Sequence, residues 1–191
     1  MGRIIVTEFV SLDGVMEDPG GAEGFAHGGW SFQISRGEEG DNFKLTETME
    51  SDALLLGRVT YEGFAEAWPQ RDGEFADKFN TMPKYVVSST LKDPTWTNTT
   101  VLDGDPVEAV TQLKETFDGD LVVHGSARLV QTLVEHDLAD ELRLMTYPML
   151  LGSGKRLFTD ASEKKTPLRL VESKVVGDGV IILIYRQATS D

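Results

Sequence analysis

The feature that most constrains the fold is a series of short apolar runs separated by segments of helical length. The first run, Arg3–Val10, is rich in β-branched residues, which favours a strand. Further runs predict strands at 53–56, 84–87, 99–102, 121–124 and 142–151. Apolar residues at helical spacing predict helices at 38–50, 60–67 and 106–116, and one after residue 126 that runs through 135. This alternation indicates an α/β fold with a mostly parallel central sheet.

The C-terminal part of the chain follows a different pattern. Two apolar runs, Leu168–Val176 and Val180–Arg186, flank Gly177-Asp178-Gly179, which is typical of a hairpin turn. We therefore expect antiparallel strands at one end of the sheet. No linker, repeat or low-complexity segment divides the 191 residues, so the whole chain, 1–191, is expected to form one domain.

Charge and composition exclude several classes of protein. The net charge of −14 disfavours nucleic acid and acidic membranes as partners, because both are polyanionic. The chain has no cysteine, which excludes disulfides, zinc–thiolate sites and a cysteine nucleophile. The longest apolar run, 180–185, is far shorter than the roughly 20 residues that span a bilayer. No signal peptide is recognised at the N-terminus, so a cytoplasmic protein is expected.

Small and hydroxyl residues follow three of the predicted strands. They are Gly57-Arg58-Val59-Thr60, Ser88-Ser89-Thr90 and Gly125-Ser126-Ala127-Arg128. Ligands of open α/β sheets bind at the carboxyl ends of strands, and helix N-termini suit phosphate. One such junction is usually an ordinary turn. Because there are three, two of them with an arginine, a phosphate-binding site and a set of three ordinary turns are equally good interpretations.

Other catalytic motifs are missing. The sequence has no G-x-G-x-x-G at a strand–helix junction, no Walker A sequence and no G-x-S-x-G elbow. The three histidines, His27, His124 and His136, have no spacing that suggests a metal site, and no metal is predicted. The Gly-rich stretch from Pro19 to Gly40 carries several aromatic residues, which favours a long loop that packs on something.

The junctions resemble those of a known family. Gly57-Arg58-Val59-Thr60-Tyr61-Glu62 is similar to the G-R-x-T-W/Y-E segment of dihydrofolate reductases, and the Ser88 and Gly125 junctions resemble that family's other two cofactor junctions. Ser11-Leu12-Asp13-Gly14 and the segment 151–158 look more like the reductase domain of bifunctional riboflavin-biosynthesis proteins. The ordered set covers nearly the whole chain. The chain therefore resembles the dihydrofolate-reductase-like superfamily, and most closely stand-alone proteins similar to that C-terminal reductase domain.

The resemblance implies a three-layer α/β/α fold with NADPH laid across the strand ends. Arg58 and Ser89 would hold the adenosine 2′-phosphate, with Ser88, Thr90 and Lys92 nearby. The rest of the predicted cofactor site comprises Gly57, Thr60, Gly125, Ser126, Ala127 and Arg128 around the pyrophosphate, and Gly14 near the nicotinamide. The loop from Pro19 to Gly40 would cover the substrate.

Two carboxylates are candidates for catalysis. Asp41 falls where dihydrofolate reductases carry their pterin-binding acid, and Asp41, Leu45 and Met49 share one face of the predicted helix. If that face is buried, Asp41 points toward the cleft and could help to supply a proton. It also suits the first turn of a helix. Asp13 could act near the nicotinamide or could be a turn aspartate that bonds backbone.

Departures from the riboflavin-pathway reductases concern the substrate. Those proteins typically carry Lys where this chain has Thr7, and Asp where it has Phe64. Together with Phe9 and Trp30, Phe64 indicates an aromatic-lined pocket suited to a planar ligand. The same three aromatic residues could instead belong to the core.

The leading interpretation is an NADPH-dependent reductase of a small planar heterocycle, such as a pteridine or a pyrimidine. A ribosylamino-pyrimidine phosphate would need a phosphate site, which Lys155 and Arg156 could supply. The alternatives are a non-catalytic nucleotide- or flavin-binding module and an interaction protein without a ligand. A homodimer is expected, because the strand 142–151 and the terminal hairpin would leave apolar edges to be covered.

Overall fold

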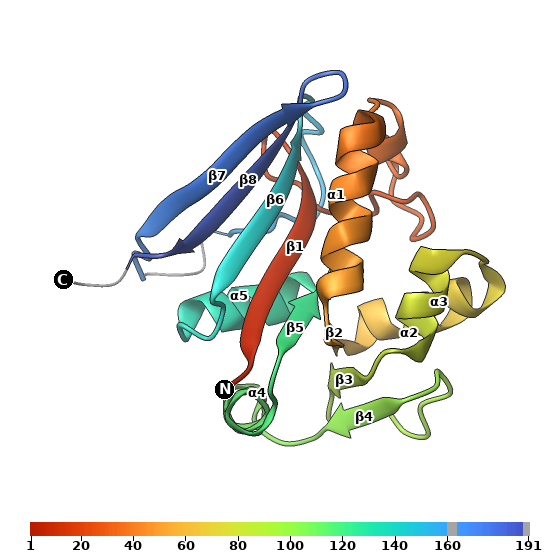
Figure 1. The fold of residues 1–191 in the computed structure, drawn as a ribbon, viewed down its shortest axis with the longest axis vertical. Coiled ribbons are helices and arrows are strands. Elements are labelled where there is room, and N and C mark those ends of the chain that lie inside the picture. Colours follow the sequence, from red (N-terminus) through yellow and green to blue (C-terminus); the bar gives the residue numbers. More distant parts are fainter. Residues whose placement is uncertain (160–163, 189–191) are drawn as a thin grey trace.

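An eight-stranded sheet organises the chain in the computed structural model, which describes residues 1–159 and 164–188 (Figure 1). The strand order is β4-β3-β2-β5-β1-β6-β8-β7. The strands are β1 (Arg3–Ser11), β2 (Ala53–Gly57), β3 (Lys84–Val87), β4 (Thr99–Leu102), β5 (Asp120–Val123), β6 (Glu141–Tyr147), β7 (Leu168–Val176) and β8 (Val180–Gln187). The helices are α1 (Gly37–Glu50), α2 (Arg58–Ala67), α3 (Glu74–Thr81), α4 (Pro106–Thr116) and α5 (Ala127–Glu135), with short 3-10 turns η1 (Trp30–Phe32) and η2 (Trp68–Gln70).

Strand direction confirms the predicted sheet. The strands from β4 to β6 run parallel, and in the centre Val6 of β1 pairs with Val123 of β5 and Leu142 of β6. The terminal hairpin is antiparallel, with β8 between β6 and β7. Gly177 and Gly179 take positive φ in its turn, as the hairpin signal predicts. A parallel sheet brings its strand ends to one edge, which places the predicted junctions together.

The helices cover the sheet on both faces and complete the predicted dihydrofolate-reductase-like α/β/α layers (Figure 1). Helices α4 and α5 pack on one face through a core that includes Val6, Val110 and Leu133. Helices α2 and α3 pack on the opposite face around Leu56 and Phe79. A third cluster, around Trp30, Tyr147 and Ile182, fills the space beside α1 and the hairpin.

Three local features differ from expectation. Helix α3 and the two 3-10 turns were not predicted, and α3 buries only Ala76 and Phe79, so its apolar signal is weak. Strand β6 ends at Tyr147 rather than Leu151, because Pro148 follows and has no N–H for the ladder. The stretch 19–40 is largely irregular, but α1 already begins at Gly37.

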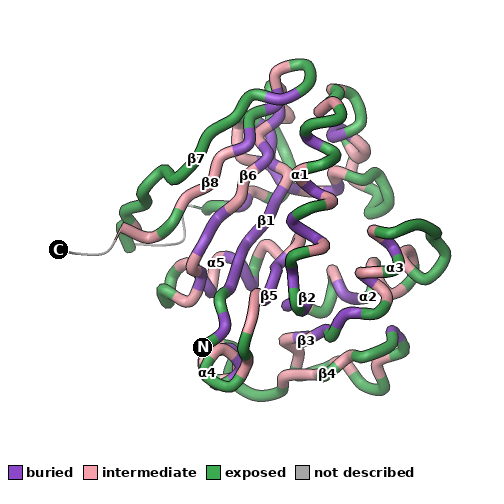
Figure 2. Tube along the Cα trace, viewed as in Figure 1, coloured by how far each residue is buried: buried purple, intermediate pink, exposed green. Residues whose placement is uncertain are grey.

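Burial falls toward the hairpin edge of the sheet (Figure 2). Central strand β1 is buried along nearly its whole length, whereas every residue of β7 except Val176 is exposed. Several of these exposed side chains are apolar, including Leu170 and Val175. Among residues 1–159 and 164–188, no helix is long and apolar enough to cross a membrane.

Candidate functional site

The predicted junctions lie side by side at the carboxyl edge of the sheet. Strands β3, β2, β5 and β1 are consecutive neighbours and run parallel, so the turns that follow them meet at this edge. The carboxyl edge is defined here by the turns at residues 11–14, 57–60, 88–90 and 124–128. The sequence prediction that the three junctions at 57–60, 88–90 and 124–128 gather in space is confirmed. Residues 11–14 lie farther along, because β1 continues to Ser11 whereas its residue Val6 is already level with Val123 at the end of β5.

Two of these turns are joined by hydrogen bonds. The N–H of Gly57 donates to Ser126 Oγ at 2.9 Å. In return, the N–H of Ser126 donates to Thr60 Oγ1 at 2.9 Å. The turns after β2 and β5 therefore form one unit, in which both Ser126 Oγ and the Ser126 N–H have definite partners.

The Gly125–Ser126 turn has an unusual backbone. Both residues are left-handed, with φ of 59° at Gly125 and 58° at Ser126. A Cβ at Gly125 would lie only 2.9 Å from Thr60 Oγ1, so this position requires glycine. Helix α5 starts at the next residue, and among the described side chains none caps its N-terminus. The free N–H groups of its first turn suit an anion such as pyrophosphate.

A buried carboxyl group supports this turn from β1. Glu8 is 6% exposed, and its Oε2 accepts the N–H of Gly125 at 3.1 Å. Within the described residues, its Oε1 has no hydrogen-bond partner. Burial raises the pKa of Glu8 well above its ordinary value; the Gly125 bond and the Lys44 charge oppose this effect, and Glu47 adds to it. Glu8 was not among the residues predicted from the sequence, although an acid inside a strand of apolar residues is a visible signal.

The predicted 2′-phosphate residues lie at the open part of this edge. Arg58 is about half exposed, and its Nη1 contacts both carboxylate oxygens of Glu62 at 2.9 Å. Ser88 Oγ accepts the N–H groups of Thr90 and Leu91 and so shapes the turn. Ser89, Thr90 and Arg128 are exposed. These side chains are accessible to a ligand that reaches the carboxyl edge.

Asp13 joins the turn after β1 to the loop after β6. Its carboxylate accepts from Ser11 Oγ at 2.6 Å and from the N–H of Gly152 at 2.8 Å. The hydrogen bond from Ser11 is the largest cause that lowers the pKa of Asp13 to about 2. Asp13 is therefore ionised at neutral pH and holds no proton to donate. Arg156 binds the carbonyl of Asp13, and the neighbouring Lys155 pairs with Glu17.

The predicted buried face of the first helix is wrong. Asp41 is exposed and pairs with Arg36 at 2.6 Å, with 63% of its side chain accessible. The buried positions of α1 are instead Gly40, Lys44, Glu47 and Thr48. The prediction placed the apolar Leu45 and Met49 on the buried face of the helix. It failed because α1 buries charged residues, which hydrophobic periodicity assigns to the solvent-facing side. The placement of Asp41 gives no support to a catalytic role.

The buried side of α1 carries a charged cluster that contacts the predicted substrate residue Thr7. Lys44 Nζ lies 2.5 Å from Glu47 Oε2 and 2.8 Å from Thr7 Oγ1. Arg143 of β6 approaches the other oxygen of Glu47 at 3.4 Å. Thr7 is thus in contact with a lysine that comes from α1. The i,i+3 spacing of Lys44 and Glu47 is common on exposed helices, so sequence alone gave no signal.

The predicted aromatic residues fall into two groups. Phe9 is half-buried, with the Arg36 guanidinium 5.2 Å and the Lys44 ammonium 5.4 Å from its ring centre. Phe64 is also half-buried and lies 6.5 Å from the His124 ring. Trp30 is 0% exposed and donates to the Glu17 carbonyl at 2.7 Å. Trp30 is thus a core residue, which corrects its predicted place in an open pocket.

His124 occupies the centre of the edge, directly before Gly125. Burial, and secondarily the Lys44 charge, lowers its pKa well below the ordinary value, so the ring is neutral. Within the described residues, its Nε2 has no hydrogen-bond partner. The sequence predicted a strand-end residue here, and the ring neighbours those of Phe64 and Phe79 at 6.5 and 5.2 Å between centres.

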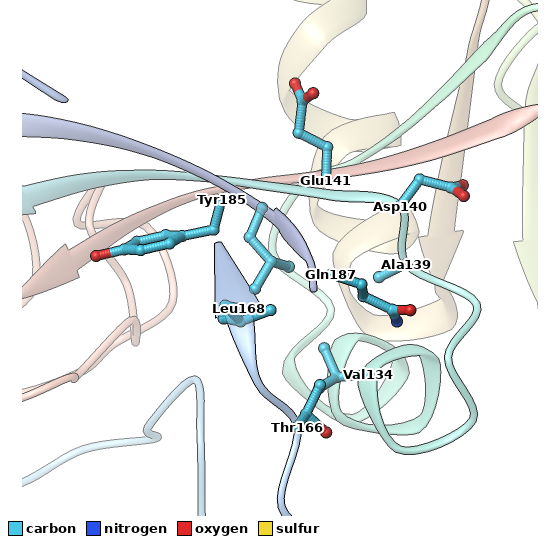
Figure 3. A pocket seen from close by; sticks show the side chains of 9 residues that line it. Val134, Ala139, Asp140, Glu141, Thr166, Leu168, Tyr185 and Gln187 are labelled. Carbon is cyan, nitrogen blue, oxygen red and sulfur yellow. The ribbon is translucent and has the colours of Figure 1, made fainter. Parts of the chain in front are cut away.

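The cavities do not coincide with the predicted site. Figure 3 shows one at the opposite edge, between the end of α5, the start of β6 and the β7–β8 strands. Its volume of about 10 Å³ is enough for one water molecule. A larger hollow of about 360 Å³ lies between α1 and the hairpin, where Phe43, Glu172 and Lys174 line it. No His, Asp and Glu side chains of the described residues gather as a metal site.

Comparisons with known proteins agree with this geometry. The family model of the RibD C-terminal domain matches residues 3–182. Uncharacterized protein YyaP from Bacillus subtilis (strain 168) is 28% identical over 189 residues, which is 96% of this chain and 94% of that protein. A crystal structure of a Shewanella sp. PV-4 protein named for riboflavin biosynthesis superposes with a TM-score of 0.78 at 22% identity, covering 97% of this chain and 99% of that one.

A Thermotoga maritima diaminohydroxyphosphoribosylaminopyrimidine deaminase/5-amino-6-(5-phosphoribosylamino)uracil reductase also shares the fold. Its TM-score is 0.64 at 16% identity, over 98% of this chain and 57% of that one. The chain thus spans little more than half of that protein.

Proposed function

The chain belongs to the RibD C-terminal domain family, and from this premise we propose that it is a reductase that uses NADPH to reduce a small planar heterocycle. Family membership supports a reductase-like fold, and the residues at the carboxyl edge support a dinucleotide ligand. A cytoplasmic location and a small-molecule substrate are part of the proposal.

The observation that carries the proposal is the hydrogen-bonded unit of Gly57, Thr60 and Ser126. Its bonds hold the left-handed Gly125–Ser126 turn beneath the uncapped start of α5. A side chain at Gly125 would collide with Thr60, so this position requires glycine. The N–H groups of Gly125 and Ser126 are bonded to Glu8 and Thr60, and the first turn of α5 offers the N–H groups that follow them. These features fit the pyrophosphate of a dinucleotide.

Each part of the cofactor would meet a different part of the edge. Arg58 and Ser89 would bind the 2′-phosphate, and Arg58 would exchange its exposed contact with Glu62 for the phosphate. Thr60, Gly125, Ser126 and Ala127 would bind the pyrophosphate. The ring would lie near Gly14, where a Cβ added to the glycine would meet no atom of the described residues within 4 Å. When bound, the cofactor would supply the hydride.

The substrate would lie between α1 and α2, beside β1. Phe9 offers a half-buried aromatic face there, and the half-buried Phe64 lies against His124. Lys44 contacts both Thr7 and the Phe9 ring, so a buried positive charge adjoins this region. An aromatic surface beside a cation favours a planar heterocycle with carbonyl or ring-nitrogen acceptors, such as a pteridine or a pyrimidine.

Titration of the purified protein with NADPH and NADH, followed by tryptophan fluorescence and energy transfer to the nicotinamide, tests the proposal. NADPH should bind at least about tenfold more tightly than NADH, because only NADPH carries the phosphate for Arg58. Binding of neither nucleotide would contradict the proposal. Binding without turnover of pteridine, pyrimidine or flavin substrates would favour a non-catalytic nucleotide-binding module.

We also propose that the protein forms a homodimer through the outer surface of β7 and β8. Leu170, Val171, Val175 and Ile181 expose apolar side chains on these strands. Covering such a surface would remove apolar area from water. Sedimentation at micromolar concentration should show a dimer, and Val175→Asp should shift it to monomer. A wild-type monomer would contradict this assembly.

A further inference from the structure

The acid beneath the Gly125–Ser126 turn is not explained by the proposed function. Glu8 lies in a strand whose neighbouring positions on the same face, Val6 and Val10, belong to the apolar core. Parallel pairing of Val6 with Val123 brings Glu8 level with Gly125, where β5 has just ended. One carboxyl oxygen accepts the N–H of Gly125, and the other has no partner among the described residues.

A neutral carboxylic acid fits this position better than a carboxylate. Since Oε2 accepts a hydrogen bond, the proton would reside on Oε1. An ionised Glu8 would place a buried negative charge directly below the turn that is suited to a phosphate. Two like charges in a low-dielectric site repel strongly, so an anion and an ionised Glu8 disfavour each other.

We propose that Glu8 is a positioning residue that holds the Gly125–Ser126 turn in its protonated form, and that anion binding at this turn is coupled to proton uptake by Glu8. The ligand's identity rests on the proposed function, whereas the coupling rests on Glu8 and the turn alone. In the balanced step, ionised Glu8, one solvent proton and the free anion give neutral Glu8 with the anion bound.

Several charged groups set the pH range of this coupling. From α1, Lys44 favours the ionised form of Glu8 and Glu47 disfavours it. Within the sheet, His124 precedes the turn and is neutral, and the β6 partner of Glu8 is the apolar Leu144. Burial is the largest effect and raises the pKa of Glu8. The folded protein therefore keeps this proton above the pH at which an exposed glutamate loses it.

Sulfate is a suitable probe because its charge is constant between about pH 5 and about pH 9. The titration would follow the amide signals of Gly125 and Ser126 in nitrogen-15-labelled protein. In the wild type, sulfate affinity should stay constant up to the pKa of Glu8 and then fall, approaching tenfold per pH unit. A pH-independent wild-type affinity, or no response of these two amides, would overturn the proposal.

Two variants separate coupling from simple structural support. Glu8→Gln keeps an oxygen for Gly125 but cannot ionise, so it should bind sulfate with an affinity that does not depend on pH. Glu8→Leu lacks that oxygen and should bind weakly at every pH. As a control, His124→Asn should keep the wild-type slope. Loss of the slope in His124→Asn but not in Glu8→Gln would assign the proton to His124 and overturn the proposal.

A further measurement needs no variant. NADH is used because it lacks the titrating 2′-phosphate. When NADH binds, the protein should take up as much as one proton, which calorimetry in two buffers of different ionisation enthalpy would measure. If sulfate shows the expected pH dependence but neither nucleotide binds, the proposed function fails and the coupling stands. If NADH binds without proton uptake and sulfate affinity is flat, the coupling fails and the proposed function stands.

Discussion

The two edges of the parallel sheet differ in whether their polar groups have hydrogen-bond or ion-pair partners. At the amino edge, charged side chains have close partners: Lys114 contacts Asp140 at 2.5 Å, and the exposed Arg3 contacts Asp120 through two nitrogens. At the carboxyl edge, Glu8 Oε1 and His124 Nε2 are buried without a hydrogen-bond partner in the described part of the chain. The third such atom is Thr48 Oγ1 of α1.

This difference supports the proposal of a ligand site at the carboxyl edge. A buried polar atom without a partner costs free energy, so folded proteins keep few of them. Lys84 at the amino edge illustrates the alternative, because its ammonium donates to three backbone carbonyls and is fully covered. Unsatisfied atoms beside the left-handed Gly125–Ser126 turn are consistent with partners that arrive with a ligand.

The largest expected contrast uses one glycine from each edge. Gly125→Ala and Gly119→Ala both force a side chain onto positive φ, with 59° and 132° respectively, and both meet a close neighbour. Each should lower the free energy of unfolding by roughly 1–2 kcal/mol. Only Gly125→Ala should also weaken NADPH binding, by at least about tenfold, because the Thr60 contact must shift.

Chemical denaturation and the fluorescence titration would measure both effects on the same samples. Equal losses of NADPH affinity in the two variants would remove the distinction between the edges. The comparison would then reflect general destabilisation rather than a ligand site.

The sequence predicted the carboxyl edge better than the interior. Strand ends followed by glycine and hydroxyl residues are local signals, so the Gly57, Ser88 and Gly125 junctions could be placed without tertiary information. The parallel order of strands then brought them together.

The charged cluster of α1 could not be predicted in the same way. Lys44 and Glu47 form a common surface pattern, and only the packing of α1 on β1 decides that they are buried beside Thr7. Asp41 was misplaced for the same reason. Glu8 is a signal in the sequence that the prediction did not use. An acid in a central strand is rarely buried unless it has a role.

A second contrast concerns the arginine at the carboxyl edge. Arg58→Ala should reduce NADPH affinity by about tenfold and leave NADH affinity unchanged, because a charge-assisted bond to the 2′-phosphate is lost. Stability should change by only about 0.3–0.5 kcal/mol, since the Glu62 pair is exposed and spaced i,i+4. An unchanged NADPH-to-NADH preference would show that Arg58 does not bind the 2′-phosphate.

A third test uses the acid that joins two loops of the carboxyl edge. The pKa of Asp13 is lowered to about 2, so its stabilising effect is present above its unfolded pKa of about 4 and is lost as pH falls toward 2. Asp13→Asn should therefore cost about 1 kcal/mol at pH 7, a value reduced for solvent screening. Unfolding free energies of both proteins should converge near pH 2, and a constant difference would mean that lost packing, not charge, explains the effect.

The smallest expected effect probes the amino edge through Lys84. Burial lowers the pKa of this lysine to about 8, while three carbonyl contacts favour its charged form. Between about pH 8 and its ordinary pKa of 10.5, the unfolded chain binds more protons, so this lysine makes stability rise with pH. The three carbonyl contacts favour the charged form in the folded state, so they make this rise smaller than burial alone would give.

Lys84→Met cannot titrate, so its unfolding free energy should lack this rise when compared with the wild type over the same pH range. NADPH affinity should be unchanged in the variant, because Lys84 begins β3 and the proposed ligand lies where β3 ends. A fall in affinity would mean that the two edges are energetically coupled through β3. If the free energy of unfolding of Lys84→Met still rises with pH over this range, the titrating group is not Lys84. The carbonyl contacts of Lys84 would then fully compensate for the burial of its charge.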